Sequence, residues 1–339
     1  MTKKEKTVQT LEAARLSKDP DAIAAALVNH SDELVKSGRL GDARRALDEA
    51  AVLHRVQGRR YDEAQCIQFT ATLCRLEGRL EEASDRAKRA ADLAGHGNPI
   101  AVSAATELAE IALARGDAPA AVAAFGNALV EGERAGLLPA ARAVLLRRRA
   151  IALANAGQFV EAANDSALAC ELLLETGNPA EATRAKIEEA TAWQSAGEKV
   201  AAEGAHDEAR RMAEAAGDHP AMADLHLLNA TKEIIGGNLP AALAAGEAAR
   251  EEALAGRAPI SYISAACAIS EIADRMGNRL AAYEALVVGW VTLSDLLGKD
   301  AGKEAFSPKL QALVERWGEA DFRKIKSRYE EQRRAISGA

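Results

Sequence analysis

Seven glycines recur along this chain of 339 residues at intervals of 38 to 41 residues. They are Gly38, Gly78, Gly116, Gly157, Gly197, Gly237 and Gly277. An alanine follows each of them by five residues, and an alanine or a serine precedes each of them by seven residues. Small residues at two fixed offsets in every period indicate that one packing geometry is repeated along the chain.

A second series of glycines lies between the members of the first. A proline follows five of its six members within three residues, and the series is Gly58, Gly97, Gly136, Gly177, Gly217 and Gly256. Glycine just past a helix end accepts the left-handed backbone conformation, and proline suits the first turn of the next helix. The segments between turns are about 16 to 18 residues long and rich in helix-forming Ala, Leu, Glu and Arg. Each period therefore holds two helices.

We predict seven hairpins, each made of an A helix and a B helix. Their ranges are 21–37/40–57, 60–77/80–95, 99–115/118–135, 139–156/159–176, 179–196/199–216, 220–236/239–255 and 259–276/279–297. The small residue of helix A and the alanine of helix B let the two backbones approach closely. Because strand signals are absent from the sequence, the expected fold class is all-α, an α-solenoid of antiparallel helix hairpins that stack on one another.

This pattern resembles the tetratricopeptide repeat, a helix–turn–helix unit. Ala150, Gly157, Phe159 and Ala162 show the pattern most clearly. The resemblance covers about residues 21–298, although the period exceeds the 34 residues of that unit and the usual early tryptophan is missing. The chain is more similar to long-repeat members such as kinesin light chains and bacterial peptide-responsive regulators. The resemblance implies a right-handed superhelix whose concave face, lined mainly by A helices, binds peptides or proteins, and it supplies no catalytic residue.

We expect one continuous solenoid, because each repeat contacts only its neighbours. Residues 1–20 would form an N-terminal tip with a short capping helix, 21–298 the seven repeats, and 299–339 capping or docking helices. The tip is expected to be disordered over 3–6 and helical over 7–16. Ser307 and Pro308 are expected to start a C-terminal helix with an apolar side, as cap and first residue. That helix either covers the last repeat or mediates partner docking or self-association.

Composition narrows the class of partner. The net charge of −7 and the pI near 5.6 argue against nucleic acid, which needs a concentrated basic surface. We expect no membrane association and a cytoplasmic location, since no apolar run approaches the roughly 18 residues of a membrane span and no signal segment opens the chain. The four cysteines lack CxxC spacing and are expected to be reduced and buried. We found no phosphate loop, HExxH or GxSxG motif and no metal-ligand spacing, so we expect no cofactor, no metal and no enzymatic activity.

Polar residues gather on the central A helices. Alignment on the turn glycines places Arg149, Glu189 and Asn229 at one position, eight residues before the glycine. In one interpretation they line the concave groove, where Arg149 binds a carboxylate of a peptide, Glu189 binds a basic side chain and Asn229 binds the peptide backbone. In the other, Arg149 and Glu189 form a structural ion pair between adjacent repeats. The predicted partner-binding residues are Arg142, Arg149, Lys186, Glu189, Trp193, His226, Asn229 and Glu233, of which Trp193 also fits a packing role.

The expected function is therefore a non-enzymatic adaptor or assembly chaperone that holds another protein or a peptide. Two alternatives stay open. One is a structural scaffold that forms a homo-oligomer through its C-terminal helix. The other is a peptide-responsive regulator without a DNA-binding module of its own, because no such module precedes the repeats in this sequence.

Overall fold

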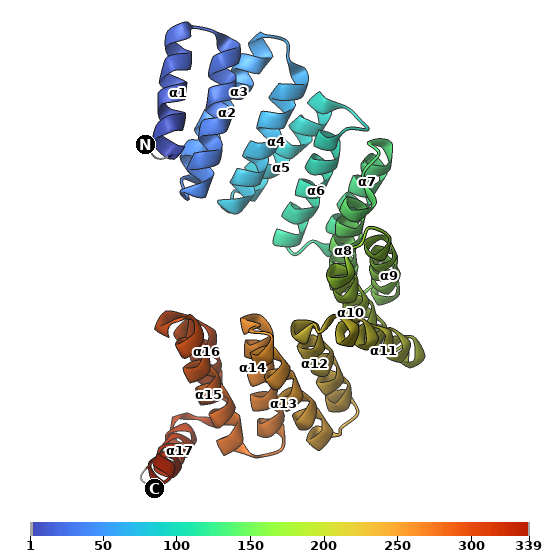
Figure 1. The fold of residues 1–339 in the computed structure, drawn as a ribbon, viewed down its shortest axis with the longest axis vertical. Coiled ribbons are helices and arrows are strands. Elements are labelled where there is room, and N and C mark those ends of the chain that lie inside the picture. Colours follow the sequence, from blue (N-terminus) through green and yellow to red (C-terminus); the bar gives the residue numbers. More distant parts are fainter. Residues whose placement is uncertain (1–2, 338–339) are drawn as a thin grey trace. The chain divides into compact units, whose positions relative to one another are not determined.

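The computed structural model describes residues 3–337, and the side chains of residues 6–335. Seventeen helices follow one another in this part of the chain, which contains no strand (Figure 1). They are α1 (Lys3–Ser17), α2 (Pro20–Lys36), α3 (Leu40–Val56), α4 (Arg60–Leu76), α5 (Leu80–Ala94), α6 (Pro99–Ala114), α7 (Ala118–Arg134), α8 (Pro139–Asn155), α9 (Phe159–Glu175), α10 (Pro179–Ala196), α11 (Lys199–Ala216), α12 (His219–Ile235), α13 (Leu239–Ala255), α14 (Pro259–Arg275), α15 (Arg279–Leu297), α16 (Lys299–Trp317) and α17 (Glu319–Ser337).

Helices α2 to α15 form the seven predicted hairpins, and each begins and ends within one residue of its predicted bounds. The turn glycines explain this agreement, because all seven of the first series have φ between +73° and +80°. That conformation ends a helix and is readily adopted only by glycine. The second series has one exception, since Arg257 rather than Gly256 takes the positive φ there.

Small residues bring the two helices of each hairpin together, as the sequence predicts. The residue seven positions before the turn glycine is buried in all seven hairpins. These residues are Ser31, Ala71, Ala109, Ala150, Ala190, Ala230 and Ser270. Because a small side chain lets two helix backbones pack closely, this position fixes the geometry of the hairpin.

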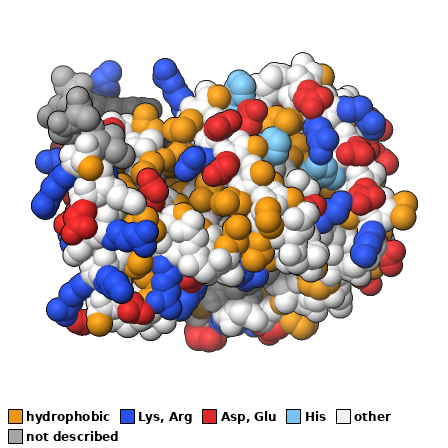
Figure 2. Space-filling view, turned by 90° about the horizontal axis from the view of Figure 1, so that it is seen from below, with side chains coloured by type: hydrophobic (Ala, Val, Ile, Leu, Met, Phe, Trp, Pro, Cys, Tyr) orange, Lys and Arg blue, Asp and Glu red, His pale blue; other side chains and the backbone are white. Residues whose placement is uncertain are grey.

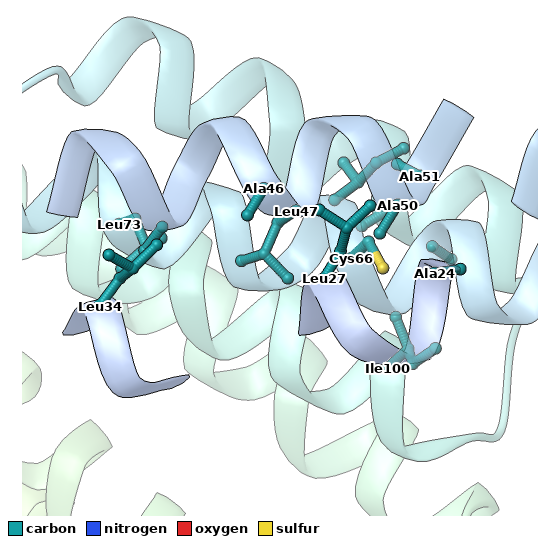
Figure 3. Close-up of a cluster of buried hydrophobic side chains, with 14 residues drawn as sticks. Ala24, Leu27, Leu34, Ala46, Leu47, Ala50, Ala51, Cys66, Leu73 and Ile100 are labelled. Atoms are coloured by element: carbon teal, nitrogen blue, oxygen red, sulfur yellow. The ribbon is translucent and has the colours of Figure 1, made fainter. Parts of the chain in front are cut away.

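The helices divide into two compact units, residues 1–177 and residues 178–339. Unit 1 contains α1 to α9 and unit 2 contains α10 to α17, so the boundary lies inside the predicted solenoid span of 21–298. An apolar cluster of unit 1 joins α2, α3, α4, α5 and α6, with Leu27, Leu47 and Cys66 among its buried members (Figure 3). All four cysteines are free thiols, and three of them are buried as expected, whereas Cys267 is only partly buried.

Two further helices, α16 and α17, follow the seven predicted hairpins. Gly318 lies 41 residues after Gly277, has φ +80° and separates α16 from α17. Gln311 and Arg323 stand at the two offsets that hold small residues in the seven hairpins. These large side chains are incompatible with the same close approach of the two helices. The rings of Phe322 and Tyr329 in α17 instead pack on Tyr283 of α15.

Two predictions about the chain ends are wrong. Helix α1 begins at Lys3, so the segment expected to be disordered is helical. Pro308 does not start a helix but lies inside α16. A proline inside a helix costs about 3 kcal/mol or more. Helix α16 persists because Phe306 and Trp317, on either side of the proline, are buried in the apolar cluster that joins α14, α15, α16 and α17.

The expectation that no segment reaches the length and hydropathy of a membrane span is also wrong. Helix α15, with 19 residues, is long and apolar enough by those two measures. Its buried residues, among them Leu286 and Leu293, belong to the apolar cluster of unit 2. Helix α15 packs against α14 and α16, and 33% of its apolar window is buried.

Charges of both signs are interspersed on the surface. On the face drawn in Figure 2, Lys and Arg side chains alternate with Asp and Glu, and apolar side chains lie between them. Many of the exposed ion pairs are local, such as Arg275 with Glu271 four residues away. This mixture agrees with the small net charge of the chain.

Candidate binding site between α11 and α12

Two positions on each B helix are buried in most of the repeats. They lie five and nine residues after the turn glycine, and both are buried in six of the seven hairpins. In the sixth hairpin, for example, a Cβ added to Gly246 would lie 3.1 Å from Ile269 of the following A helix. The buried pairs are Ala43 and Leu47, Ala83 and Ala87, Ala121 and Phe125, Ala162 and Ser166, Ala242 and Gly246, and Ala282 and Leu286.

The fifth hairpin is the exception. Its residues at these two positions are Ala202 and His206, and neither is buried. A hollow of about 820 Å³ lies there between α11 and α12, entirely within unit 2. We call it the α11–α12 hollow. Its lining residues are Lys199, Ala202, Glu203, His206, Asp207 and Arg210 of α11, Leu228, Asn229, Lys232, Glu233 and Ile235 of α12, and Gln194, Gly197, Gly236 and Asn238 of the adjoining helix ends and turns.

Two polar contacts cross from α11 to α12 at the hollow. Lys232 Nζ lies 2.7 Å from Glu203 Oε1, and both side chains are more than half exposed. His206 Nε2 lies 3.3 Å from the carbonyl oxygen of Leu225. Since exposed ion pairs contribute about 0 to 1 kcal/mol, the first contact is weak enough for a ligand to displace.

The imidazole of His206 is oriented from both sides. Its Nδ1 lies 3.3 Å from Nη2 of Arg210, one turn further along α11. A carbonyl oxygen only accepts and a guanidinium only donates hydrogen bonds, so the neutral ring with hydrogen on Nε2 satisfies both contacts. The ring is thereby fixed at a position that holds a core side chain in the other hairpins.

The wall formed by α12 combines apolar and amide groups. Leu228 belongs to a buried cluster with Ala190 and Ala205, against which Trp193 packs. The Glu233 carboxylate accepts a hydrogen bond of 3.0 Å from the side-chain amide of Asn238. The hollow therefore offers apolar surface, amides and charges of both signs, a chemistry suited to non-covalent recognition of a peptide.

Some of the predicted site residues meet in unit 2, and two of them line the hollow. Asn229 and Glu233 belong to its α12 wall. Lys186 and Glu189 of α10 form an ion pair of 2.8 Å, and the indole Nε1 of Trp193 donates to Glu189 over 3.3 Å. Burial, as the largest cause, lowers the pKa of His226. That residue lies on α12 outside the hollow's lining.

Arg142 and Arg149 lie in unit 1 and have partners of their own. Arg149 donates to Asp165 of the same hairpin, from Nε over 2.6 Å and from Nη2 over 2.7 Å. This hydrogen bonding raises the pKa of the Arg149 guanidinium. Arg142 lies 3.4 Å from Glu133. Arg149 and Glu189 are thus each engaged within their own unit.

Ion pairs between adjacent A helices do occur, at residues other than those considered from the sequence. Arg75 of α4 lies 2.5 Å from Glu107 of α6, and Arg148 of α8 lies 3.3 Å from Glu110 of α6. The structural interpretation of the charged A helices therefore holds for these pairs in unit 1.

Sequence reasoning missed the α11 wall of the hollow. The fifth repeat keeps the alanine that stands five residues after the turn glycine, Ala202, so the small-residue pattern did not indicate that packing differs there. The signal lay four residues further on, where His206 replaces a small or apolar core residue. Among the described residues, no three His, Cys, Asp or Glu side chains are grouped as a metal site would require.

Comparison with solved structures identifies the architecture. The chain is similar to a tetratricopeptide repeat protein from Parabacteroides merdae, with 17% identity, 84% of this chain and 97% of that chain covered, and a TM-score of 0.56. The fold is that of a tetratricopeptide-repeat solenoid. This confirms the resemblance expected from the sequence. No protein-family model and no curated protein matches the chain.

Two further structures share the tetratricopeptide-repeat architecture. The apo form of RapI has 11% identity, with 94% of this chain and 99% of that chain covered, and a TM-score of 0.57. A signal transduction ATPase with a tetratricopeptide repeat sensor, from Pyrococcus horikoshii, has 13% identity and a TM-score of 0.61, with 86% of this chain but only 46% of that chain covered. At these identities the similarity establishes the fold alone.

Proposed function

We propose that this tetratricopeptide-repeat protein binds a segment of a partner protein or a peptide in the α11–α12 hollow, as a non-enzymatic adaptor or assembly chaperone. The observation that carries the proposal is that Ala202 and His206 are less buried than the equivalent residues of the other hairpins. Six hairpins bury these two positions, whereas the fifth leaves them partly exposed. An apolar side chain from a partner can supply the packing that α12 does not provide.

The size and chemistry of the hollow support this occupant. Binding sites commonly have volumes of about 300 to 1,000 Å³ and combine apolar walls with a few oriented polar groups. Leu228 and Ala202 would contact an apolar side chain of the partner. The amides of Asn229 and Gln194 can each donate and accept, which suits a peptide backbone.

The scaffold alternative has less support. It was motivated by aromatic residues of the C-terminal helices, and these are engaged inside unit 2. Phe322 and Tyr329 each contact the ring of Tyr283 with centroids 5.5 Å apart. Trp317 is buried, with Arg279 5.6 Å above its ring. These side chains therefore do not form an exposed apolar surface for a second copy of the chain.

Site-specific photo-crosslinking tests the proposal. A benzophenone amino acid is placed at Ala202, inside the hollow, and in a control protein at Val200. Val200 is on the same helix, is 87% exposed and does not line the hollow. After irradiation in native lysate, crosslinked proteins are identified by mass spectrometry. The expected result is a partner captured from position 202 and absent from position 200.

A second variant separates binding from folding. Asn229→Ala removes one amide from the hollow and, because hydrogen bonds of this kind contribute about 1 kcal/mol or more, should weaken capture at least severalfold. Circular dichroism checks that helicity is unchanged. The proposal is rejected if both crosslinking positions capture the same proteins, or if the still-helical Asn229→Ala protein captures its partner undiminished.

A further inference from the structure

Two arginines converge on one buried carboxylate in unit 1. Arg55 of α3 donates from Nε to Glu63 Oε1 of α4 over 2.8 Å, and Arg89 of α5 reaches the same oxygen over 3.1 Å. The Glu63 residue is only 3% exposed, whereas the arginine side chains are 51% and 52% exposed. Because both contact a single oxygen, the two guanidinium groups lie close together on side chains that are each about half exposed.

The arginines border a second hollow, of about 650 Å³, between α3 and α5. We call it the arginine hollow. Ile67 and Ala51 are buried and Val52 is half exposed, so part of its wall is apolar. Its lining residues are Asp48, Ala51, Val52, Arg55, Ile67, Glu82, Asp85, Arg86 and Arg89.

The lining of the arginine hollow carries three arginines and three carboxylates, the latter being Asp48, Glu82 and Asp85. Arg86 contacts both Asp48, over 2.6 Å, and Glu82, over 2.9 Å, so these two carboxylates already have a cation. Glu63 can neutralise only one of the two arginines that share it. Two adjacent like charges repel, and an incoming anion would relieve that repulsion. Asp85 is the remaining carboxylate of the lining, and it would oppose such an anion.

We propose that the arginine hollow binds a carboxylate side chain of an acidic peptide, with a neighbouring apolar side chain of that peptide on Ile67 and Val52. Guanidinium groups match carboxylates by paired hydrogen bonds, which suits Arg55 and Arg89 to this ligand. Glu63 is a positioning residue, because it holds both guanidinium groups in place without facing the ligand. The site lies in unit 1, on elements other than α11 and α12, and is independent of the proposed function.

The test uses the full chain and a labelled peptide of alternating aspartate and leucine, with an asparagine–leucine peptide as its uncharged counterpart. Fluorescence anisotropy should show binding of the aspartate peptide that weakens as salt is added, and at least tenfold weaker binding of the asparagine peptide. Arg55→Gln and Arg89→Gln should each weaken binding about tenfold. Lys88→Gln, which removes an exposed cation on α5 outside the lining, is the matched control and should have little effect.

A gain of affinity provides the sharper test. Asp85→Asn removes the opposing carboxylate from the rim and should tighten binding about two- to threefold, an effect that misfolding cannot produce. Arg55→Lys keeps the charge but loses the paired N–H groups of the guanidinium, so its affinity for the aspartate peptide should fall between those of the wild type and Arg55→Gln. Equal affinity for the two peptides would overturn the proposal. So would arginine variants that stay helical and bind like the wild type, or Asp85→Asn binding no tighter than the wild type.

Discussion

Arg149 and Asp165 stand eight residues before and eight residues after Gly157, and their side chains form two hydrogen bonds of 2.6 and 2.7 Å within one hairpin. Thr70 and Arg86 occupy the same two positions around Gly78 and are joined by a hydrogen bond of 3.0 Å. In these two hairpins the position eight residues before the turn glycine thus faces its own B helix. The seventh hairpin differs, because Ile269 at this position packs against Gly246 of the preceding B helix.

The Arg149–Asp165 pair should therefore contribute to stability. Asp165 is 7% exposed, so Arg149→Met leaves a buried carboxylate without its cation and should lower the free energy of unfolding by about 2 kcal/mol. Removing both charges in Arg149→Met/Asp165→Leu should restore much of this loss. Urea denaturation followed by circular dichroism measures both, with the exposed pair Arg275–Glu271 as the control. An Arg149→Met protein as stable as the wild type would show that the arginine is not structural.

Because Ala202 of the fifth hairpin lines a hollow, leucine substitutions at two equivalent alanines should differ in their effect on stability. Ala242 is fully buried, so Ala242→Leu overpacks the sixth hairpin and should cost about 1 to 3 kcal/mol. Ala202 lines the α11–α12 hollow, where the added atoms have room, and Ala202→Leu should change stability by less than about 0.5 kcal/mol. Chemical denaturation of the two variants decides between an open and a closed hollow. Equal costs would mean that α11 packs on α12 as in the other repeats.

Close backbone approach between α15 and α16 predicts a strong effect at one glycine. A Cβ at Gly302 would lie 2.7 Å from the carbonyl oxygen of Trp290 and closer still to Ser294 Oγ. Gly302→Ala should therefore separate the two helices and lower the melting temperature by several degrees. Gly204 of α11 has no atom within 4 Å of an added Cβ, so Gly204→Ala should instead stabilise the protein by about 0.5 to 1 kcal/mol. Calorimetry of the two variants should show shifts of opposite sign.

The sequence allows most of this fold to be predicted, because its turns depend on local chemistry. Glycine with positive φ and proline in the first helical turn act within a few residues, and the helix bounds follow from them. Gly318 shows the limit of that approach. It keeps the period but lacks both small neighbours, and the two helices that it separates, α16 and α17, do not pack on each other as the helices of the seven hairpins do.

The candidate site is harder to predict, because it depends on how two hairpins meet. Ala202 satisfies the repeat pattern even though its surroundings differ from those of Ala242. Likewise, alignment places Arg149 and Glu189 at equivalent positions but does not reveal that Asp165 lies across the hairpin from the arginine. Tertiary packing decides which groups a charged side chain contacts, and the alignment of the repeats alone does not show those contacts.

Glu131 connects α7 to the turn between α5 and α6 and should make stability depend on pH. Its carboxylate accepts hydrogen bonds from the backbone N–H of Gly97 over 2.7 Å and from His96 and Arg134 over 2.9 and 2.7 Å. The Gly97 hydrogen bond, as the largest cause, lowers the pKa of Glu131 below its ordinary value. The unfolded chain, with a glutamate pKa of about 4.3, therefore binds this proton more readily than the folded protein does.

The resulting stabilisation is present above the unfolded-state pKa and is lost as the pH falls through the lower folded-state pKa. Glu131→Gln should consequently melt below the wild type at pH 7, and the gap should close as the solution is acidified below about pH 4. Thermal melts across this range measure the gap. Glu133→Gln, at an exposed glutamate of the same helix, is the control and should follow the wild type closely at every pH. A gap for Glu131→Gln that is unchanged in acid would show that the connection depends on side-chain shape and not on the carboxylate charge.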